Sequence, residues 1–283
     1  MVAMTYIVHG ATGAQGAPVL AALTAAGLSA TAAVRNTAAV QSHPAVAVDS
    51  TSADSLVAAY TGADGVFVHL PVGSPEQQMA AARAIGEAAT RARPGRVVFS
   101  TSGFPIGVPG QEGPGDVLLG LLAAGGVSHA VLAPKLFLEN LLLPVVVGPA
   151  REEGVLPYPL REDYAVSWCS HLDVADAAVA LLTDTSVSGT IGVGALPALL
   201  GADLAAGFAG HLERDVRFSP VTPEEFGRQI IPMFGEAGAR PVIDSYVWRA
   251  TQSGEVIDTA TSAQTVLGLT PRTVGQWLRD LGL

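Results

Sequence analysis

Three glycines near the start of the chain, Gly10, Gly13 and Gly16, follow the spacing G-x-x-G-x-x-G between an apolar run and an apolar helical pattern. The first permits a tight turn, the second lets the backbone approach a pyrophosphate, and the third lets a helix pack closely on a strand. The free N–H groups at the helix start would face the phosphates. The spacing therefore predicts a dinucleotide-binding turn, with a merely structural turn as the alternative. The residues between the glycines would line the same site: Thr12, Ala14 and Gln15.

The elements that must position this turn alternate short β-branched runs with helical stretches up to about residue 134. Such alternation predicts parallel strands joined by crossover helices, an α/β fold with a doubly wound parallel sheet of the Rossmann type. Ligands of such sheets bind at the carboxyl ends of the strands, so residues there are the functional candidates. The strands are expected near residues 5–9, 29–35, 45–49, 65–70, 96–101 and 128–133, and the clearest helix near 75–91.

Beyond residue 150 the pattern is less regular, although residues 173–182 indicate a helix that begins with an acidic N-cap. We expect residues 1–150 to form the dinucleotide-binding domain. Residues 151–283 are expected to form a smaller α/β lobe that covers the substrate, with some elements returning to the first sheet. Residues 104–115 are rich in glycine and proline and directly follow a strand end, which predicts a mobile active-site loop.

The composition excludes several classes of function. A formal net charge of -10 argues against a nucleic-acid binder, which needs a basic face. Cys169 is the only cysteine, so neither an internal disulfide nor a cysteine zinc cluster can form, and no metal site is expected. The most apolar region, residues 117–147, is broken by glycine, proline and charged residues, so no membrane span is expected. Since no basic segment precedes an apolar run at the start, we expect a cytoplasmic protein.

Four segments, taken in order, resemble the atypical short-chain dehydrogenase/reductase superfamily, most closely its NmrA-like and quinone-oxidoreductase-like branch. They are residues 10–16, Val34-Arg-Asn36, residues 132–140 with the run Pro-Lys-Leu-Phe-Leu-Glu-Asn, and residues 168–176 with the run His-Leu-Asp-Val-Ala-Asp. The resemblance covers nearly the whole chain. It implies an NAD(P)H-dependent oxidoreductase with a small apolar or aromatic substrate, and it leaves a homodimer open.

Arg35 indicates which nicotinamide cofactor would bind. An acidic residue after the second strand would receive the ribose hydroxyls of NAD, whereas a guanidinium fits the 2′-phosphate of NADP. We therefore predict NADP(H), with a solvated surface arginine as the alternative. Asp49 resembles the family's adenine-facing acid, or it is an ordinary helix N-cap. Leu70, Pro71 and Lys135 complete the predicted cofactor contacts.

The chain departs from the superfamily's usual catalytic pair, Tyr-x-x-x-Lys, in which the lysine lowers the pKa of the tyrosine so that the phenol can exchange a proton with the substrate oxygen. The residues four positions after its tyrosines are Gly10, Asp64, Glu162, Trp168 and Ala250. None of them is a lysine, so carbonyl reduction that depends on this pair is not expected.

Three other polar residues are candidates for catalysis. Ser102 matches the superfamily's substrate-oxygen-binding serine and could donate to a carbonyl or quinone oxygen, or it only caps a turn. His69 could contact the cofactor ribose or donate a proton, or it is a packed core histidine. Lys135, the only lysine, follows the sixth strand at a place that borders the nicotinamide in this superfamily. It could polarise a substrate oxygen or bind the cofactor, or it only reaches solvent.

Aromatic residues could form an apolar wall for a flat substrate, with ordinary core packing as the alternative. They are Phe104, Phe137, Tyr158, Tyr164 and Trp168. Together the patterns predict an NADPH-dependent reductase of an apolar conjugated acceptor, such as a quinone or an aromatic carbonyl compound, because a quinone delocalises the arriving charge and needs only a weak proton donor. The missing pair also leaves open a non-catalytic NADP(H) sensor that acts through a protein partner. A biosynthetic isomerase or reductase with a dedicated metabolite is a third interpretation.

Overall fold

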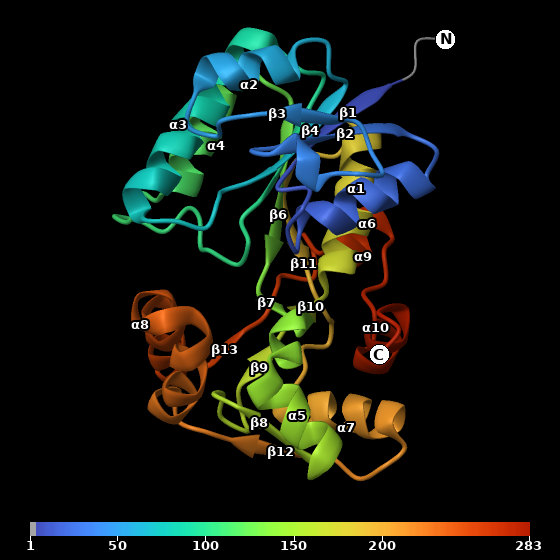
Figure 1. Cartoon of the computed structure of the whole chain (residues 1–283), viewed down its shortest axis with the longest axis vertical. Coiled ribbons are helices and arrows are strands. Elements are labelled where there is room, and N and C mark those ends of the chain that lie inside the picture. Colours follow the sequence, from blue (N-terminus) through green and yellow to red (C-terminus); the bar gives the residue numbers. More distant parts are fainter. Residues whose placement is uncertain (1–3) are drawn as a thin grey trace. The chain divides into compact units, whose positions relative to one another are not determined.

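A computed structural model describes residues 4–283 (Figure 1). The chain forms two compact units, and each unit draws on three separate segments. Unit 1 comprises Met1–Pro134, His171–Val193 and Ala260–Leu269, and unit 2 comprises Lys135–Ser170, Gly194–Thr259 and Thr270–Leu283. Both units therefore contain sequence from the two halves of the chain.

Unit 1 contains a seven-stranded parallel sheet with the order β11-β6-β5-β4-β1-β2-β3. Its strands are β1 (Thr5–His9), β2 (Ser29–Val34), β3 (Ala45–Ala47), β4 (Gly65–His69), β5 (Val97–Ser100), β6 (His129–Pro134) and β11 (Gly189–Val193). The predicted doubly wound fold is confirmed, and the six predicted strands lie close to their expected bounds. Because β1 lies between β2 and β4, the order of strand addition reverses at β1, which is where such sheets bind ligands.

Helices cover both faces of this sheet (Figure 1). One face carries α2 (Ala53–Tyr60), α3 (Pro75–Ala92) and α4 (Pro114–Ala124), and the other carries α1 (Gly16–Ala25) and α6 (His171–Thr183). The short elements of the unit are η1 (Thr37–Ala39) and α9 (Ala263–Leu267). Coverage on both faces explains why the central strands are nearly continuous apolar runs, as in β4, where Val66, Phe67 and Val68 are fully buried.

Two helix starts show how local signals set these elements. The N-terminus of α3 has a capping box, in which Ser74 Oγ accepts from the Gln77 N–H at 3.3 Å and Gln77 Oε1 accepts from the Ser74 N–H at 3.0 Å. The prediction that Asp173 is the N-cap of α6 was wrong. The helix begins at His171, and Asp173 lies buried within the first turn instead of at the N-cap.

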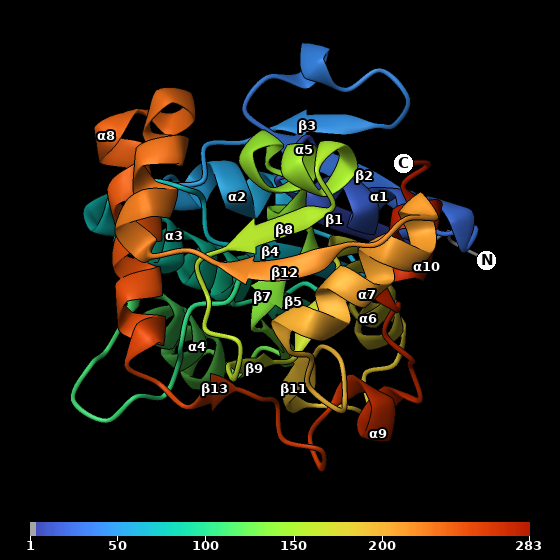
Figure 2. The same cartoon turned by 90° about the horizontal axis from the view of Figure 1, so that it is seen from below.

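Unit 2 contains three short parallel strand pairs and their covering helices. The pairs are β7 (Leu136–Phe137) with β10 (Trp168–Cys169), β8 (Val155–Tyr158) with β12 (Arg217–Pro220), and β9 (Ala165–Val166) with β13 (Gly254–Glu255). The helices are η2 (Leu138–Leu142), α5 (Pro144–Glu152), α7 (Gly201–Leu212), α8 (Pro223–Ala250) and α10 (Val274–Asp280). Figure 2 shows β8 beside β12, and α5 and α7 pack against this pair. The longest helix, α8, is interrupted at Gly235, where φ is 69°.

Among the residues that the structure describes, no helix has both the length and the apolar character that a membrane span requires.

Candidate functional site

The glycine turn connects β1 to α1 at the reversal point of the sheet. Gly10 has φ of 59°, and the Gly13 N–H closes the turn by donating to the Gly10 carbonyl oxygen at 2.7 Å. Gln15 is the N-cap residue of α1, which begins at Gly16. The first N–H groups of a helix have no acceptor within the helix, so this turn presents donors and the positive end of the helix dipole.

A side chain at each of the three glycines would meet different surroundings. A Cβ atom at Gly16 would lie 2.3 Å from the carbonyl oxygens of both His9 and Gly10, so the helix packs directly on the turn. A Cβ at Gly10 would lie 2.3 Å from His69 Nε2. A Cβ at Gly13 would approach the Gly10 carbonyl oxygen at 3.2 Å, with no other described atom beyond its immediate neighbours within 4 Å. The side of the turn at Gly13 is therefore open to a ligand.

His69, at the end of β4, places a buried polar atom against this turn. Its Nδ1 lies 3.1 Å from the Leu70 carbonyl oxygen. Since a carbonyl can only accept, Nδ1 carries the proton, and the neutral ring leaves Nε2 as an acceptor. Burial lowers the pKa of His69, which favours this neutral form. Nε2 is buried without a hydrogen-bond partner among the described residues, and a donor such as a ribose hydroxyl would satisfy it.

Two buried histidines, His9 and His171, accompany the partly buried His69 in unit 1. The Tyr60 hydroxyl is hydrogen-bonded to His9 Nε2 at 2.7 Å. Burial, assisted by the charge that His69 would carry, lowers the pKa of His9 to about 3. The same two causes lower the pKa of His171 to about 4. These imidazoles are therefore neutral at pH 7, and none of them brings positive charge to the turn.

Ser102 is linked to the glycine turn by side-chain hydrogen bonds. Gln15 Nε2 donates to Ser102 Oγ at 2.8 Å, and the hydroxyl of Ser100 donates to Gln15 Oε1 at 2.8 Å. The Ser102 N–H donates to Ser100 Oγ at 3.3 Å and closes the ring. Ser100 is fully buried and Ser102 is half-buried. The Ser102 hydroxyl is thus fixed beside the turn that the glycines form.

The remaining predicted cofactor residues of unit 1 also follow strand ends. Arg35 is exposed directly after β2. Asp49 accepts from the Thr51 hydroxyl at 2.7 Å and from its N–H at 2.9 Å, and these bonds lower the pKa of Asp49. The alternative that Asp49 is the N-cap of α2 is wrong, because Ser52 occupies that position. After β4, the Pro71 carbonyl oxygen accepts from the Gln78 side chain at 3.2 Å.

The predicted substrate-facing residues are divided between the two units. Phe104, in unit 1, is 65% exposed in the segment before α4. In unit 2, Lys135 precedes β7, Phe137 lies within β7, and both are partly buried. The other three aromatics, Tyr158, Tyr164 and Trp168, are at most 1% exposed within the core of unit 2. This burial favours the core interpretation for these three side chains, and their part in a pocket stays a prediction.

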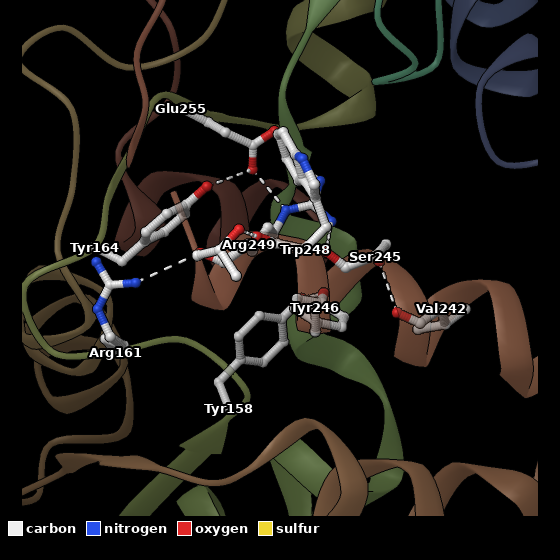
Figure 3. Close-up of polar contacts among 10 residues, drawn as sticks. Tyr158, Arg161, Tyr164, Val242, Ser245, Tyr246, Trp248, Arg249 and Glu255 are labelled. Atoms are coloured by element: carbon white, nitrogen blue, oxygen red, sulfur yellow. Dashed lines mark hydrogen bonds and ion pairs between the residues drawn. The ribbon is translucent and has the colours of Figure 1, made fainter. Parts of the chain in front are cut away.

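Unit 2 also contains a buried polar cluster that the sequence did not indicate (Figure 3). Arg249 Nε and Glu255 Oε2 form an ion pair at 2.6 Å, and the Tyr164 hydroxyl donates to the same oxygen at 3.3 Å. The hydroxyls of Tyr158 and Tyr246 are hydrogen-bonded to each other. Arg161 donates to the Ala250 carbonyl oxygen at 2.8 Å, at the end of α8. The ion pair and the hydrogen bond from Arg161 hold the end of α8 to the segments at residues 161 and 255.

The glycine motif places Gln15 in the predicted cofactor site, but it did not indicate the hydrogen bond from the Gln15 side chain to Ser102. One sequence signal could have indicated the ring. Ser100 and Ser102 are two positions apart, so along an extended strand they would face the same side. No group of three or more His, Cys, Asp or Glu side chains among residues 4–283 is arranged to hold a metal ion.

Comparisons with known proteins agree with this geometry. Residues 10–124 match the model of a protein family described as NAD(P)H-binding. These residues run from the first glycine of the turn to the end of α4 and include Arg35, His69 and Ser102. The predicted nicotinamide dinucleotide cofactor is thereby confirmed. At the sequence level, no curated protein matches the chain.

Solved structures share the fold over almost the whole chain. A nucleoside-diphosphate-sugar epimerase from Staphylococcus aureus has a TM-score of 0.79 at 17% identity and covers 98% of this chain and 100% of its own. The NADPH-dependent quinone oxidoreductase of Escherichia coli, complexed with NADPH, has a TM-score of 0.77 at 19% identity, with coverage of 99% and 100%. The triphenylmethane reductase of Citrobacter sp., complexed with NADP(H), has a TM-score of 0.75 at 17% identity, with coverage of 98% and 99%. The predicted resemblance to NAD(P)H-dependent proteins of the quinone-oxidoreductase type is confirmed at the level of the fold.

Proposed function

We propose that this chain, in which residues 10–124 form an NAD(P)H-binding domain, is an NADPH-dependent reductase that transfers hydride to an apolar conjugated acceptor such as a quinone or an aromatic carbonyl compound. The observation that carries the proposal is the position of Ser102, whose hydroxyl is fixed at 2.8 Å from Gln15 within the glycine turn. A hydrogen-bond donor for the acceptor oxygen is thereby held beside the cofactor-binding turn. The quinone oxidoreductase and the triphenylmethane reductase that share this fold are consistent with the proposal.

The residues of unit 1 fit NADPH at three places. The N–H groups at the start of α1 would bind the pyrophosphate, and Gly13 leaves room for its approach. The exposed guanidinium of Arg35 would bind the 2′-phosphate, because it offers paired donors to phosphate oxygens. The buried Nε2 of His69 would accept from a ribose hydroxyl. NADPH, when bound, supplies the hydride.

The protonation state of His69 favours a binding role over acid catalysis. Its one ring proton is on Nδ1 and is donated to the Leu70 carbonyl oxygen, and burial lowers the pKa of the ring. We therefore propose that Ser102 donates to the acceptor oxygen. A serine hydroxyl is a weak acid, which suits an acceptor that delocalises the arriving negative charge. The absence of a Tyr-x-x-x-Lys pair in the sequence is consistent with such an acceptor.

Steady-state oxidation of NADPH tests the proposal, with menadione, further quinones and a triphenylmethane dye as acceptors. We expect turnover with at least one quinone, and we expect Ser102→Ala to lower kcat about tenfold or more, since a lost transition-state hydrogen bond has effects of this order. Ser42→Ala, at an exposed bend, is the matched control and should leave kcat unchanged. NADPH binding without oxidation by any of these acceptors would contradict a reductase and would favour a cofactor sensor.

A further inference from the structure

We propose that Gln15 is a positioning residue, which joins the cofactor-binding turn to Ser102 and keeps the hydroxyl proton of Ser102 available for the acceptor oxygen. The inference rests on the proposed function and deepens it, because it assigns a role to a side chain that the glycine motif does not use. It predicts that the Gln15 amide acts on the reaction only through Ser102.

The hydrogen bonds around Gln15 have a consistent direction. The Ser100 hydroxyl donates to Gln15 Oε1, and Gln15 Nε2 donates to Ser102 Oγ, both at 2.8 Å. The Ser102 N–H donates to Ser100 Oγ at 3.3 Å. All three bonds run in one sense around the ring, so Ser102 Oγ acts as an acceptor within it. The hydroxyl proton of Ser102 is not used by the ring, and a serine hydroxyl can donate while it accepts.

The backbone at Ser102 has a conformation that is unfavourable for a serine. Ser102 has φ of 56° and Gly103 has φ of 86°, and the Phe104 N–H donates to the Thr101 carbonyl oxygen at 3.0 Å. Positive φ at both central residues is typical of a type I′ turn, in which glycine, asparagine and aspartate predominate. A serine in this conformation is strained, and such strain persists only where surrounding contacts enforce it. The bonds to Gln15 and Ser100 supply those contacts.

Gln15 connects the glycine turn to the end of β5. It is the N-cap residue of α1, so its main chain belongs to the turn that would hold the pyrophosphate. Gln15 is only 9% exposed, and its side chain points to the end of β5. One residue therefore joins two parts of unit 1 that are 87 positions apart in sequence. Any shift of the turn on cofactor binding would be transmitted to the Ser102 hydroxyl.

Kinetics of four variants test the inference: Gln15→Leu, Gln15→Glu, Ser102→Ala and the double variant Gln15→Leu/Ser102→Ala. With NADPH and menadione, we expect Gln15→Leu to lower kcat by up to about tenfold while the dissociation constant of NADPH changes little. The double variant should be no slower than Ser102→Ala, because residues that act as a unit are non-additive. Independent losses that multiply in the double variant would overturn the inference.

Gln15→Glu gives a readout that a merely structural role would not move. An ionised carboxylate can only accept hydrogen bonds. The carboxylate introduced at position 15 would therefore accept from the Ser102 hydroxyl, whose proton would no longer be available to the acceptor oxygen of the substrate. Burial raises the pKa of a carboxyl group, so lowering the pH should restore a donor at position 15. We expect kcat of Gln15→Glu, relative to the unaltered protein, to rise as the pH falls from 8 to 6. A pH-independent ratio would contradict the assigned direction of the ring.

Thermal unfolding of the cofactor-free protein separates this inference from the proposed function. The Tm decrease of the double variant should be smaller than the sum of the decreases caused by Gln15→Leu and Ser102→Ala alone, because each single substitution already removes the same hydrogen bond. If the protein oxidises no acceptor but the Tm changes are non-additive, the proposed function fails and the link between Gln15 and Ser102 stands. Additive Tm changes would overturn the link even in an active reductase.

Discussion

Acidification from pH 7.5 to pH 5.0 is expected to destabilise the fold through its buried histidines. In the unfolded chain each histidine has an ordinary pKa near 6.5. In the folded protein burial lowers the pKa of His9 to about 3 and that of His171 to about 4. Below pH 6.5 the unfolded chain therefore takes up protons that the folded protein does not. The stability from these groups is fully present above pH 6.5 and is lost as the pH falls towards the folded pKa values.

The size of the effect follows from these pKa values. At pH 5.0 an unfolded histidine has gained about 2 kcal/mol by protonation, from about 1.5 pH units at about 1.4 kcal/mol each. His9 and His171 together then lower the free energy of unfolding by about 4 kcal/mol. Burial of His69 acts in the same direction. A domain is typically stable by about 5–15 kcal/mol, so the loss is a large part of the total.

Urea unfolding between pH 7.5 and pH 5.0 measures this loss. His9→Gln retains a hydrogen-bonding group beside the Tyr60 hydroxyl but does not titrate, so the loss at pH 5.0 should shrink by about 2 kcal/mol. Ser42→Ala, at an exposed position, removes no titratable group and should leave the loss unchanged. Hydrogen bonds lower the pKa of Asp49 and Glu76, so their contributions are lost at still lower pH. An unfolding free energy that is flat over this range, or equally pH-dependent in His9→Gln, would refute the reasoning.

Two further predictions concern the cofactor turn and its second strand. Arg35→Asp should change the ratio of the NADH and NADPH dissociation constants by about tenfold or more in favour of NADH, because it removes the 2′-phosphate donors and adds a ribose acceptor. Fluorescence titration with both cofactors measures the ratio, and an unchanged ratio would assign Arg35 to the solvated surface. Gly16→Ala should cost about 1–3 kcal/mol or more in urea unfolding, because its Cβ would lie 2.3 Å from two backbone oxygens. Gly120→Ala is the matched control within α4, where a Cβ meets no described atom within 4 Å, and it should stabilise by about 0.5–1 kcal/mol. Equal effects of the two alanines would contradict the packing role of Gly16.

The central sheet was predictable because its strands carry strong local signals. β4, for example, is the run Gly-Val-Phe-Val-His bounded by Gly62 before it and Pro71 after it. Such β-branched runs between turn residues indicate buried parallel strands without knowledge of their partners. β11 lacks that signal, because two of its five residues are glycine. Its place beside β6 is set by contacts with the rest of the sheet, which no local pattern contains.

The side-chain arrangement was less predictable, because residue type does not determine exposure. The residue types of Tyr158, Tyr164 and Trp168 are compatible with a flat pocket wall as well as with a hydrophobic core. Their burial is decided by elements far away in sequence. Tyr158 lies in ring contact with Phe226 and Tyr246, both from α8. The hydrogen bond between Gln15 and Ser102 likewise depends on tertiary structure that brings the start of α1 to the end of β5.

Gly10 shows how a motif and its surroundings constrain each other. Its φ of 59° alone favours glycine, as the spacing of the motif predicts. The structure adds a second constraint, because the His69 ring occupies the space that a side chain at position 10 would need. That ring is neutral, donates through Nδ1 to the Leu70 carbonyl oxygen, and leaves Nε2 as a buried acceptor. A buried acceptor without a donor is unfavourable, so its position against the turn favours a ligand hydroxyl there. His69 therefore favours a cofactor contact at this turn independently of the glycine spacing.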